Sequence, residues 1–184
     1  MLAEYTYKKN VLLDVQYRLD AKTRGKDMLK KADSAKQKWG GIDTSIDRWL
    51  SDRKNLIVRY CDLIDTKSFD SCEVAVNKYR SFCQVLLDYV SAGHFEIYDR
   101  LVEEAESFKD GSEALATELY PKIQLTTEAA LDFNDTFDKM PEEMEAIEEL
   151  KPRLSELGQQ LEDRFEMEDL LIEKLHTAHA GQVA

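Results

Sequence analysis

Glycine and proline are scarce in this sequence of 184 residues, which has seven of the first and three of the second. These residues are the commonest breaks between secondary-structure elements, so their scarcity predicts few turns and long elements. Apolar and polar residues also fail to alternate with a period of two over any useful length, and that alternation is the pattern of a half-buried strand. Long elements without strands are helices, and the sequence therefore predicts an all-α fold.

Cysteine and long apolar runs are scarce as well. The three cysteines, Cys61, Cys72 and Cys83, are widely spaced and form no CxxC pair, a pattern that argues against a disulfide scaffold or a structural zinc site. The sequence lacks the run of about 20 apolar residues that spans a membrane and the apolar block of a signal peptide. We therefore expect a cytoplasmic protein with reduced thiols and no membrane association.

Basic charge is in short supply beyond the first 40 residues. The chain has 25 Lys and Arg against 37 Asp and Glu, a formal net charge of −12. Residues 1–40 contribute +5, which leaves −17 for residues 41–184. A body of this charge repels nucleic acid and anionic membranes and attracts basic surfaces, so we expect no direct nucleic-acid binding. The alternative interpretation is that the acidic residues only keep the protein in solution and attract no particular partner.

The sequence does contain apolar residues at spacings of three and four, which is the signature of amphipathic helices. They form four stripes, over residues 42–64, 70–108, 113–137 and 141–180. Short connections place sequential helices side by side. The pattern therefore predicts an antiparallel up-down four-helix bundle.

Several residues predict where these helices begin or bend. Asp70, followed by a glutamate three residues later, has the spacing of a capping box at the start of the second helix. Pro141 suits the first position of the fourth helix. Pro121 and Pro152 lie inside the third and fourth stripes, and each removes one backbone donor, so these helices are expected to be bent or broken.

Residues 1–27 differ from the rest of the chain, because they are basic and only weakly periodic. We expect them to form an N-terminal extension with little regular structure. Met28 is a second plausible start. The helical bundle domain is therefore predicted over residues 28–184.

Catalytic residue combinations are few. The candidate pairs for nucleophilic catalysis are Cys83 with His94 and Ser91 with His94, and each lies within a single predicted helix. Cys83 and His94 would be about 16 Å apart along its axis at 1.5 Å per residue, which is too far for proton transfer. No glycine-rich phosphate loop of the GxxxxGK or GxGxxG type is present. We expect a protein that is not an enzyme and needs no cofactor, with Cys83 in its core.

A metal-binding bundle of the haemerythrin or ferritin type is the alternative function. Glu173 and His176 are three residues apart and could face one ion from a single helix, with His94 and Glu168 as further ligands. The chain has only three histidines and no second Glu-x-x-His pair, which disfavours such a site. Near a helix C-terminus, a partly cationic histidine is also favoured by the helix dipole.

Three polar residues fall on otherwise apolar stripes. His94 continues the second stripe, and Arg164 and Glu168 lie on the fourth. Buried polar groups need hydrogen-bond partners, so we expect a contact of Glu168 with Arg164 or with His94. Both a structural pair and a binding pocket would account for these residues.

Three segments resemble the regulator of sigma D and alginate-regulator (Rsd/AlgQ) family of bacteria. The resemblance runs from about residue 28 to the C-terminus, except over the second half of the third predicted helix. The motifs IDRWL and DYVSAGHFEIYDR are its most specific parts, since bundle patterning alone does not require them. The three segments are KWGGIDTSIDRWLSDR over residues 38–53, FCQVLLDYVSAGHFEIYDRL over 82–101 and RFEMEDLLIEKLHTAH over 164–179.

The resemblance implies an anti-sigma factor that binds the C-terminal promoter-reading domain of the housekeeping sigma factor, as a monomer and one to one. It further suggests a phosphotransfer or alarmone-metabolising protein as an additional partner, although no residue can be tied to one. The family's acidic partner-contact position falls on Asp88. The matching motif positions expected on or under the same face are Asp47, Arg48, Trp49, Ser91, His94, Phe95, Tyr98 and Glu168.

Overall fold

The computed structural model describes the chain in four stretches, residues 2–41, 44–66, 69–98 and 112–180. Within them, side chains are described from Gln16 to Lys174, apart from residues 112 and 113.

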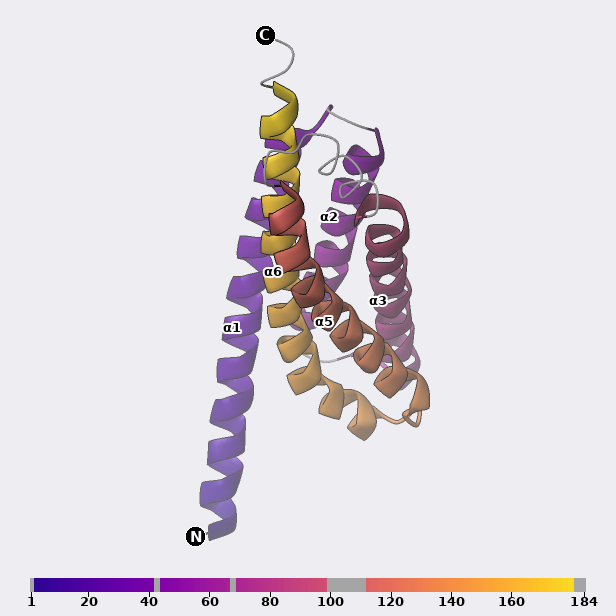
Figure 1. The fold of residues 1–184 in the computed structure, drawn as a ribbon. Coiled ribbons are helices and arrows are strands. Elements are labelled where there is room, and N and C mark those ends of the chain that lie inside the picture. Colours follow the sequence, from indigo (N-terminus) through magenta and orange to yellow (C-terminus); the bar gives the residue numbers. More distant parts are fainter. Residues whose placement is uncertain (1, 42–43, 67–68, 99–111, 181–184) are drawn as a thin grey trace.

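All regular structure in these stretches is helical, and none of them contains a strand, which confirms the predicted all-α class for the described chain. Figure 1 shows the helices packed side by side, with the two termini at opposite ends of the molecule. No described helix is long and apolar enough to cross a membrane. The elements are α1 (Leu2–Trp39), α2 (Thr44–Asp65), α3 (Cys72–Ala92), the π-helix η1 (Gly93–Tyr98), α5 (Ser112–Lys139) and α6 (Met144–Ala180).

Helix α1 is an element that the sequence patterns did not predict. Residues 2–27, which we expected to have little regular structure, form one continuous helix with residues 28–39. Its described buried face combines small residues, Ala21, Gly25, Ala32 and Ala35, with Met28 and Trp39, so only two large apolar side chains mark it in the sequence. A Cβ atom at Gly25 would lie 2.7 Å from Cys61 Sγ, so α1 and α2 approach closely there.

Helix α1 lies against both α2 and α6, and α5 packs on α6 and α3. The N-terminal turns of α1 reach past the other helices in Figure 1. The four predicted stripes correspond to α2, α3 with η1, α5 and α6, so α1 is a further long helix alongside them. The part of the second stripe at residues 99–108 lies outside the described residues.

The core consists of the predicted apolar stripes. Rings of the core interlock: Phe82 packs edge-on against Phe133 at 6.0 Å between centroids, and Tyr79 stacks on Phe137 at the same separation. Cys83 is buried among them, as predicted, and burial raises the pKa of its thiol to about 12. The tightly packed stripes carry most of the stabilisation of such a bundle, because apolar burial is the dominant favourable term in folding.

Three predictions about helix ends and prolines need correction. The cap of α3 is Ser71, whose hydroxyl accepts a hydrogen bond from the Val74 N–H at 3.2 Å, in place of the predicted Asp70. Helix α6 begins at Met144, so Pro141 precedes it and does not occupy its first position. Pro121 and Pro152 are tolerated inside α5 and α6, which are not broken. Figure 1 shows α6 changing direction along its length, in keeping with the predicted bend.

Candidate functional site

A buried carboxylate, Glu168 of α6, lies at the centre of a polar cluster inside the bundle. Its Oε1 accepts hydrogen bonds from the Tyr98 hydroxyl at 2.6 Å and from Arg164 Nε at 2.7 Å. Its Oε2 accepts from Arg53 Nη2 at 3.0 Å and from the Tyr89 hydroxyl. None of the five side chains is more than 2% exposed. We call these five residues the charge cluster.

The two arginines of the charge cluster are satisfied by further contacts. Arg164 Nη1 donates to the hydroxyls of Thr126 and Thr127 at 3.1 and 2.7 Å, and its Nη2 donates to Tyr98 Oη at 2.8 Å. Arg53 Nη1 donates to Asp169, a carboxylate at the edge of the cluster. Such complete pairing is what a buried charge requires, since an unpaired one costs several kcal/mol.

Burial fixes the protonation of the groups around these arginines. It raises the pKa values of the Tyr89 and Tyr98 phenols well above their ordinary range, so both remain neutral donors. Burial also raises the pKa of Asp169, although the neighbouring Arg53 opposes the shift. The two tyrosines of the charge cluster are therefore fixed as hydrogen-bond donors to the Glu168 carboxylate.

The charge cluster is assembled from the inner faces of four helical elements, of which α6 contributes two residues and the others one each. Arg53 comes from α2, Tyr89 from α3, Tyr98 from η1, and Arg164 and Glu168 stand one turn apart on α6. Residues four apart on a helix are neighbours. The α6 pair thus needs no tertiary contact to meet.

The π-helical turn η1 gives the end of α3 its shape. Gly93 begins it, and a Cβ atom there would lie 3.0 Å from Tyr98 Oη and 3.2 Å from Arg164 Nη2. The absent side chain leaves room for the charge cluster. The same turn leaves Phe95 74% exposed while Tyr98 is buried, so it presents one aromatic residue to solvent and one to the interior.

Trp49 connects the charge cluster to the surface. Its ring stacks on Tyr89 at 5.5 Å and meets Tyr98 edge-on at 5.8 Å. Above it lies a surface hollow of about 250 Å³ between the start of α2 and the end of α3. The side chains that line this hollow include Arg48, Asp52 and Glu96.

The remaining predicted site residues lie on the exposed side of α3 and η1 or beside it. Asp88, Ser91 and Phe95 are exposed and follow one another at spacings of three and four. Arg48 is exposed on the neighbouring α2. With His94 these residues form what we call the candidate face: Arg48, Asp88, Ser91, His94 and Phe95.

Residues 28–176 match the model of the family described as "Regulator of RNA polymerase sigma(70) subunit, Rsd/AlgQ". This chain belongs to the Rsd/AlgQ family. It is 35% identical to a "Regulator of sigma D" of Yersinia enterocolitica over 79% of this chain and 89% of that protein. A "Regulator of sigma D" of Enterobacter sp. (strain 638) is 36% identical over 79% and 88% of the two chains.

Two positions in the Rsd/AlgQ motifs have structural roles that the sequence did not predict. The Asp47 carboxylate is half-buried and accepts the Gly41 N–H at 2.9 and 3.1 Å, which closes the turn between α1 and α2. Gly41 adopts a φ of 87°, a conformation that favours glycine. Asp47 thus holds the start of α2 beneath Arg48 and Trp49.

Of the two alternative partners predicted for Glu168, His94 is not the one that the structure shows. His94 is exposed, with its Nδ1 3.2 Å from the Tyr120 hydroxyl of α5 and Phe95 edge-on to its ring at 4.8 Å. The predicted Arg164–Glu168 contact is confirmed. Gly93, three residues after Val90 and four before Ile97, takes the inward position on this stripe, and His94 is exposed one residue later.

Sequence reasoning missed Arg53 and Tyr89 as members of the charge cluster. The available signal was the gap in the apolar stripe of residues 42–64, which is α2, because Arg53 lies in phase between Leu50 and Leu56. A charged residue in phase with apolar neighbours predicts a buried, paired charge.

The described metal-ligand candidates do not converge. Glu168 is taken up by the arginines and tyrosines of the charge cluster, and Glu173 forms an ion pair with Lys38 at 2.7 Å. Among the described side chains, no group of three or more His, Cys, Asp and Glu residues could hold a metal ion. The side chain of His176 lies outside the described residues.

Proposed function

We propose that this chain is an anti-sigma factor that binds the C-terminal promoter-reading domain (region 4) of the housekeeping sigma factor. In this role it keeps that domain from core polymerase and from promoter DNA. The observation that carries the proposal is the match of residues 28–176 to a family of regulators of the sigma(70) subunit. The relatives named "Regulator of sigma D" support the same conclusion. Binding takes place in the cytoplasm, one to one, and requires no catalysis or cofactor.

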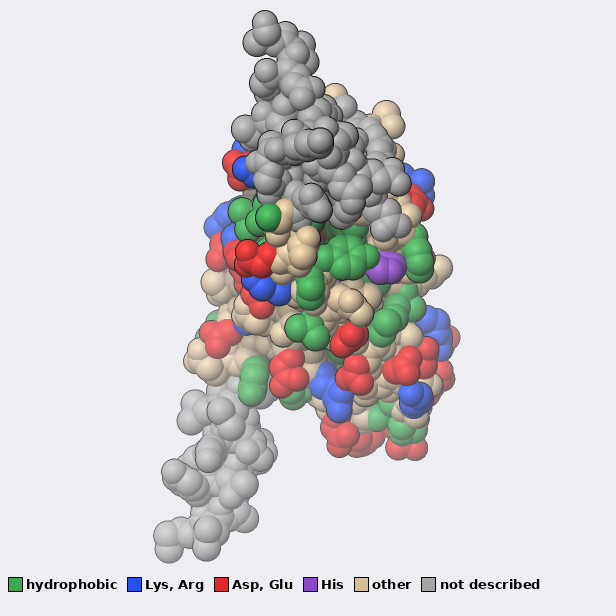
Figure 2. All heavy atoms as spheres, in the orientation of Figure 1, with side chains coloured by type: hydrophobic (Ala, Val, Ile, Leu, Met, Phe, Trp, Pro, Cys, Tyr) green, Lys and Arg blue, Asp and Glu red, His purple; other side chains and the backbone are tan. Residues whose placement is uncertain are grey.

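Electrostatics supports this choice of partner. A domain that reads promoters through a helix-turn-helix presents a basic surface to phosphate. Residues 41–184 of this chain carry a net charge of −17. Figure 2 shows acidic side chains spread over the visible side of the molecule, most densely at the lower end where α5 ends and α6 begins. The body as a whole would therefore attract the basic domain, and local contacts would orient it.

The candidate face supplies those local contacts in the proposal. Asp88 is exposed and available to pair with a cation of the sigma domain. Phe95 is a large apolar side chain, 74% exposed beside His94. Aromatic residues surrounded by polar ones are typical anchors of protein interfaces. Ser91 and Arg48 complete the rim of the face.

The residues beneath the candidate face act by holding it in shape. Trp49, Tyr98 and Glu168 are buried, so a partner would not touch them without rearrangement. Their stacking and hydrogen bonds fix η1 against α2 and α6. A preorganised surface loses less side-chain entropy on binding, which is the contribution we assign to these three residues and to Asp47.

The proposal is tested by titrating the full chain into the isolated C-terminal domain of the housekeeping sigma factor, with calorimetric detection. We expect a one-to-one complex whose affinity falls as salt rises from about 50 to 300 mM, because the attraction is partly electrostatic. A promoter DNA fragment should compete with the chain for the domain. Absence of binding at low salt, or a complex that promoter DNA does not disturb, would rule out this mechanism.

A further inference from the structure

Helix α5 reaches the candidate face through an aromatic side chain, Tyr120. Its hydroxyl oxygen lies 3.2 Å from Nδ1 of His94, and the two ring centroids are 6.1 Å apart. Figure 2 shows His94, the one histidine whose side chain is described, at the surface between apolar side chains. The candidate face therefore has a neighbour on α5 in addition to α2.

Tyr120 is held in place by the charge cluster beneath it. Its ring meets the ring of Tyr98 edge-on, with 6.0 Å between the centroids and 81° between the planes. Tyr98 is 2% exposed and donates to Glu168 Oε1 at 2.6 Å. Edge-to-face aromatic contacts are favourable and directional, so the Tyr120 hydroxyl has a defined position beside His94.

Acid–base chemistry gives the hydrogen bond between Tyr120 and His94 a direction. A neutral imidazole has one nitrogen that carries a proton and one that accepts. A phenol is a better donor than an imidazole N–H, and the unprotonated ring nitrogen is a better acceptor than a phenol oxygen. The Tyr120 hydroxyl therefore donates to Nδ1 of His94. The hydrogen bond on one ring nitrogen determines the state of the other, so the ring proton lies on Nε2.

We propose that Tyr120 positions His94 so that its Nε2–H donates a hydrogen bond to a main-chain carbonyl oxygen of the sigma domain. This inference rests on the proposed function. The His94 side chain is exposed, and Nε2 has no hydrogen-bond partner among the described residues. A body with a net charge of −17 over residues 41–184 disfavours a carboxylate as the acceptor. The candidate face thus offers the partner an acceptor, Asp88, and a neutral donor, His94.

The first measurement is nitrogen-15 NMR of the histidine rings in the free full chain at about pH 8, where an imidazole is neutral. The signals of His94 are those that His94→Gln removes. We expect Nδ1 without a proton and Nε2 with one. Tyr120→Phe, which removes only the hydroxyl group, should raise the population with the proton on Nδ1. A proton on Nδ1 in the unsubstituted chain, or a tautomer population that Tyr120→Phe leaves unchanged, would overturn the positioning role of Tyr120.

The second measurement is calorimetric titration of the sigma domain at the same pH. Glutamine places its amide NH2 near the position of Nε2, whereas asparagine places it near Nδ1. Both substitutions lose the ring, so the difference between them isolates the donor. We expect His94→Gln to bind about fivefold more tightly than His94→Asn, and Tyr120→Phe to bind about threefold more weakly than the unsubstituted chain. These ratios should be equal at about 50 and 300 mM salt, because donor and acceptor are uncharged.

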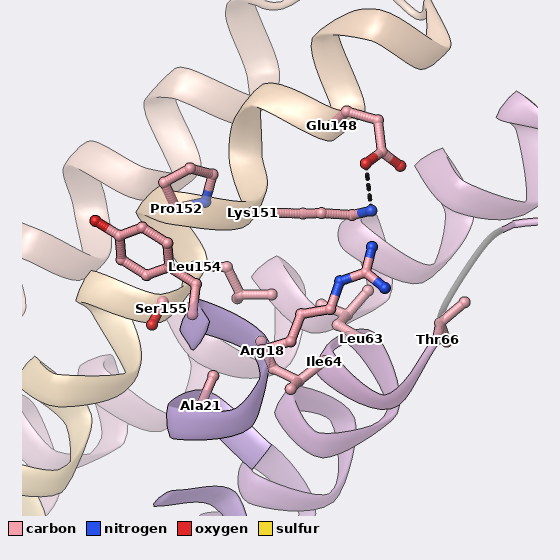
Figure 3. Close-up of a pocket in the computed structure, with 11 residues that line it drawn as sticks. Arg18, Ala21, Leu63, Ile64, Thr66, Glu148, Lys151, Pro152, Leu154 and Ser155 are labelled. Carbon is pink, nitrogen blue, oxygen red and sulfur yellow. Dashed lines mark hydrogen bonds and ion pairs between the residues drawn. The ribbon is translucent and has the colours of Figure 1, made fainter. Parts of the chain in front are cut away.

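Tyr17→Phe is the matched control. Tyr17 belongs to α1 and lines a cavity of about 230 Å³ between α1, α2 and α6 (Figure 3), and no residue of the candidate face lines that cavity. The control should change neither the His94 signals nor the affinity for the sigma domain. An unchanged amide spectrum away from the substitution verifies folding, and the two His94 variants suffice for the binding test if Tyr120→Phe fails that check.

Two kinds of failure can be told apart. Equal affinities of His94→Gln and His94→Asn, in a chain that does bind the sigma domain, would overturn the donor role of His94 and leave the anti-sigma proposal standing. A ratio that shrinks as salt rises would overturn the uncharged acceptor. No binding by the unsubstituted chain would end the anti-sigma proposal and this inference with it, whatever the tautomer of His94.

Discussion

Arg53 of α2 and Glu168 of α6 form an ion pair of 3.0 Å in which the side chains are 1% and 0% exposed. Removing two charges from water costs several kcal/mol per ion unless other hydrogen bonds satisfy them. Tyr89, Tyr98 and Arg164 supply those bonds on Glu168. The pair therefore fixes how α2, α3 and α6 meet beneath the candidate face. The stability of this arrangement requires every hydrogen-bond partner of the pair to be present.

Glu168→Gln should destabilise the protein strongly. The substitution keeps the shape of the side chain but leaves the buried Arg53 and Arg164 without their shared counter-charge. Breaking one partner of a buried ionic group costs about 3–5 kcal/mol. Urea unfolding followed by circular dichroism measures the change. Glu166→Gln, two residues away on a side chain that is 59% exposed, should cost no more than about 1 kcal/mol. Similar losses for the two variants would contradict the role assigned to the charge cluster.

Gly158→Ala should also destabilise the protein, for a steric reason. A Cβ atom at this position of α6 would lie 2.1 Å from the Tyr60 hydroxyl oxygen and 2.5 Å from its Cζ. Tyr60 is fully buried, so its ring has little space to retreat. Overpacking of this kind costs about 1–3 kcal/mol, whereas alanine would otherwise favour the helix over glycine. Thermal unfolding measures the effect, and the exposed neighbour Gln159→Ala should change the melting temperature little. A more stable Gly158→Ala variant would show that α2 and α6 are less tightly apposed.

Asp88→Ala should weaken sigma binding without unfolding the protein. Asp88 is exposed on α3, so its loss removes no buried contact. A charged interface contact of this kind is worth at least about 1 kcal/mol, or roughly fivefold in Kd. Calorimetric titration with the sigma domain provides the Kd. Glu73→Ala removes an exposed charge from the first turn of the same helix and serves as the control for net charge. If both variants lower the affinity for the sigma domain equally, the attraction comes from the net charge of the whole protein and Asp88 has no specific role.

Alkaline pH should reduce stability as the unfolded chain loses protons that the folded protein retains. Burial raises the pKa of Cys83 to about 12 and those of Tyr89 and Tyr98 well above the ordinary range. In the unfolded chain these groups ionise at about pH 8.5–10. Above that range the unfolded state binds fewer protons, so the free energy of unfolding falls with pH.

Each of these groups lowers the free energy of unfolding by up to about 1.4 kcal/mol per pH unit in this interval. The loss begins near pH 9 and continues toward the folded pKa values. Urea unfolding at a series of pH values from 7 to 11 measures it. Cys83→Ala should make the decline shallower, because one of the contributing groups is gone. A free energy of unfolding that stays constant to pH 11 would contradict the burial of these groups.

Much of the fold could be predicted from the sequence because large apolar side chains recur in phase. The apolar stripes that contain Trp49, Tyr79 and Phe133 lie in the core, as helical periodicity predicts. Helix α1 could not be found in this way. Apart from Met28 and Trp39, its described inner face consists of alanines and of Gly25, where α1 approaches α2 closely, and small residues give little contrast with a polar outer face.

The candidate site was only partly predictable. The Arg164–Glu168 pair follows from two charged residues one turn apart on an apolar stripe. The position of His94 does not follow, because Gly93 and His94 both fit spacings of three and four between Val90 and Ile97, and the structure buries Gly93. Ser71 and Asp70 are adjacent acceptors of similar capping strength, so the choice between them depends on where the first turn of α3 packs.

The unbroken course of α1 has a mechanical consequence. Its 38 residues form a rod about 57 Å long at 1.5 Å per residue, and Pro does not interrupt it. One end projects past the bundle (Figure 1), and the other passes directly into the glycine turn that Asp47 clamps. The middle of the rod is held to α2 by the Lys22–Asp65 ion pair and to α6 by the Lys31–Glu162 ion pair, so a force on the projecting end is resisted along the rod before it reaches the start of α2.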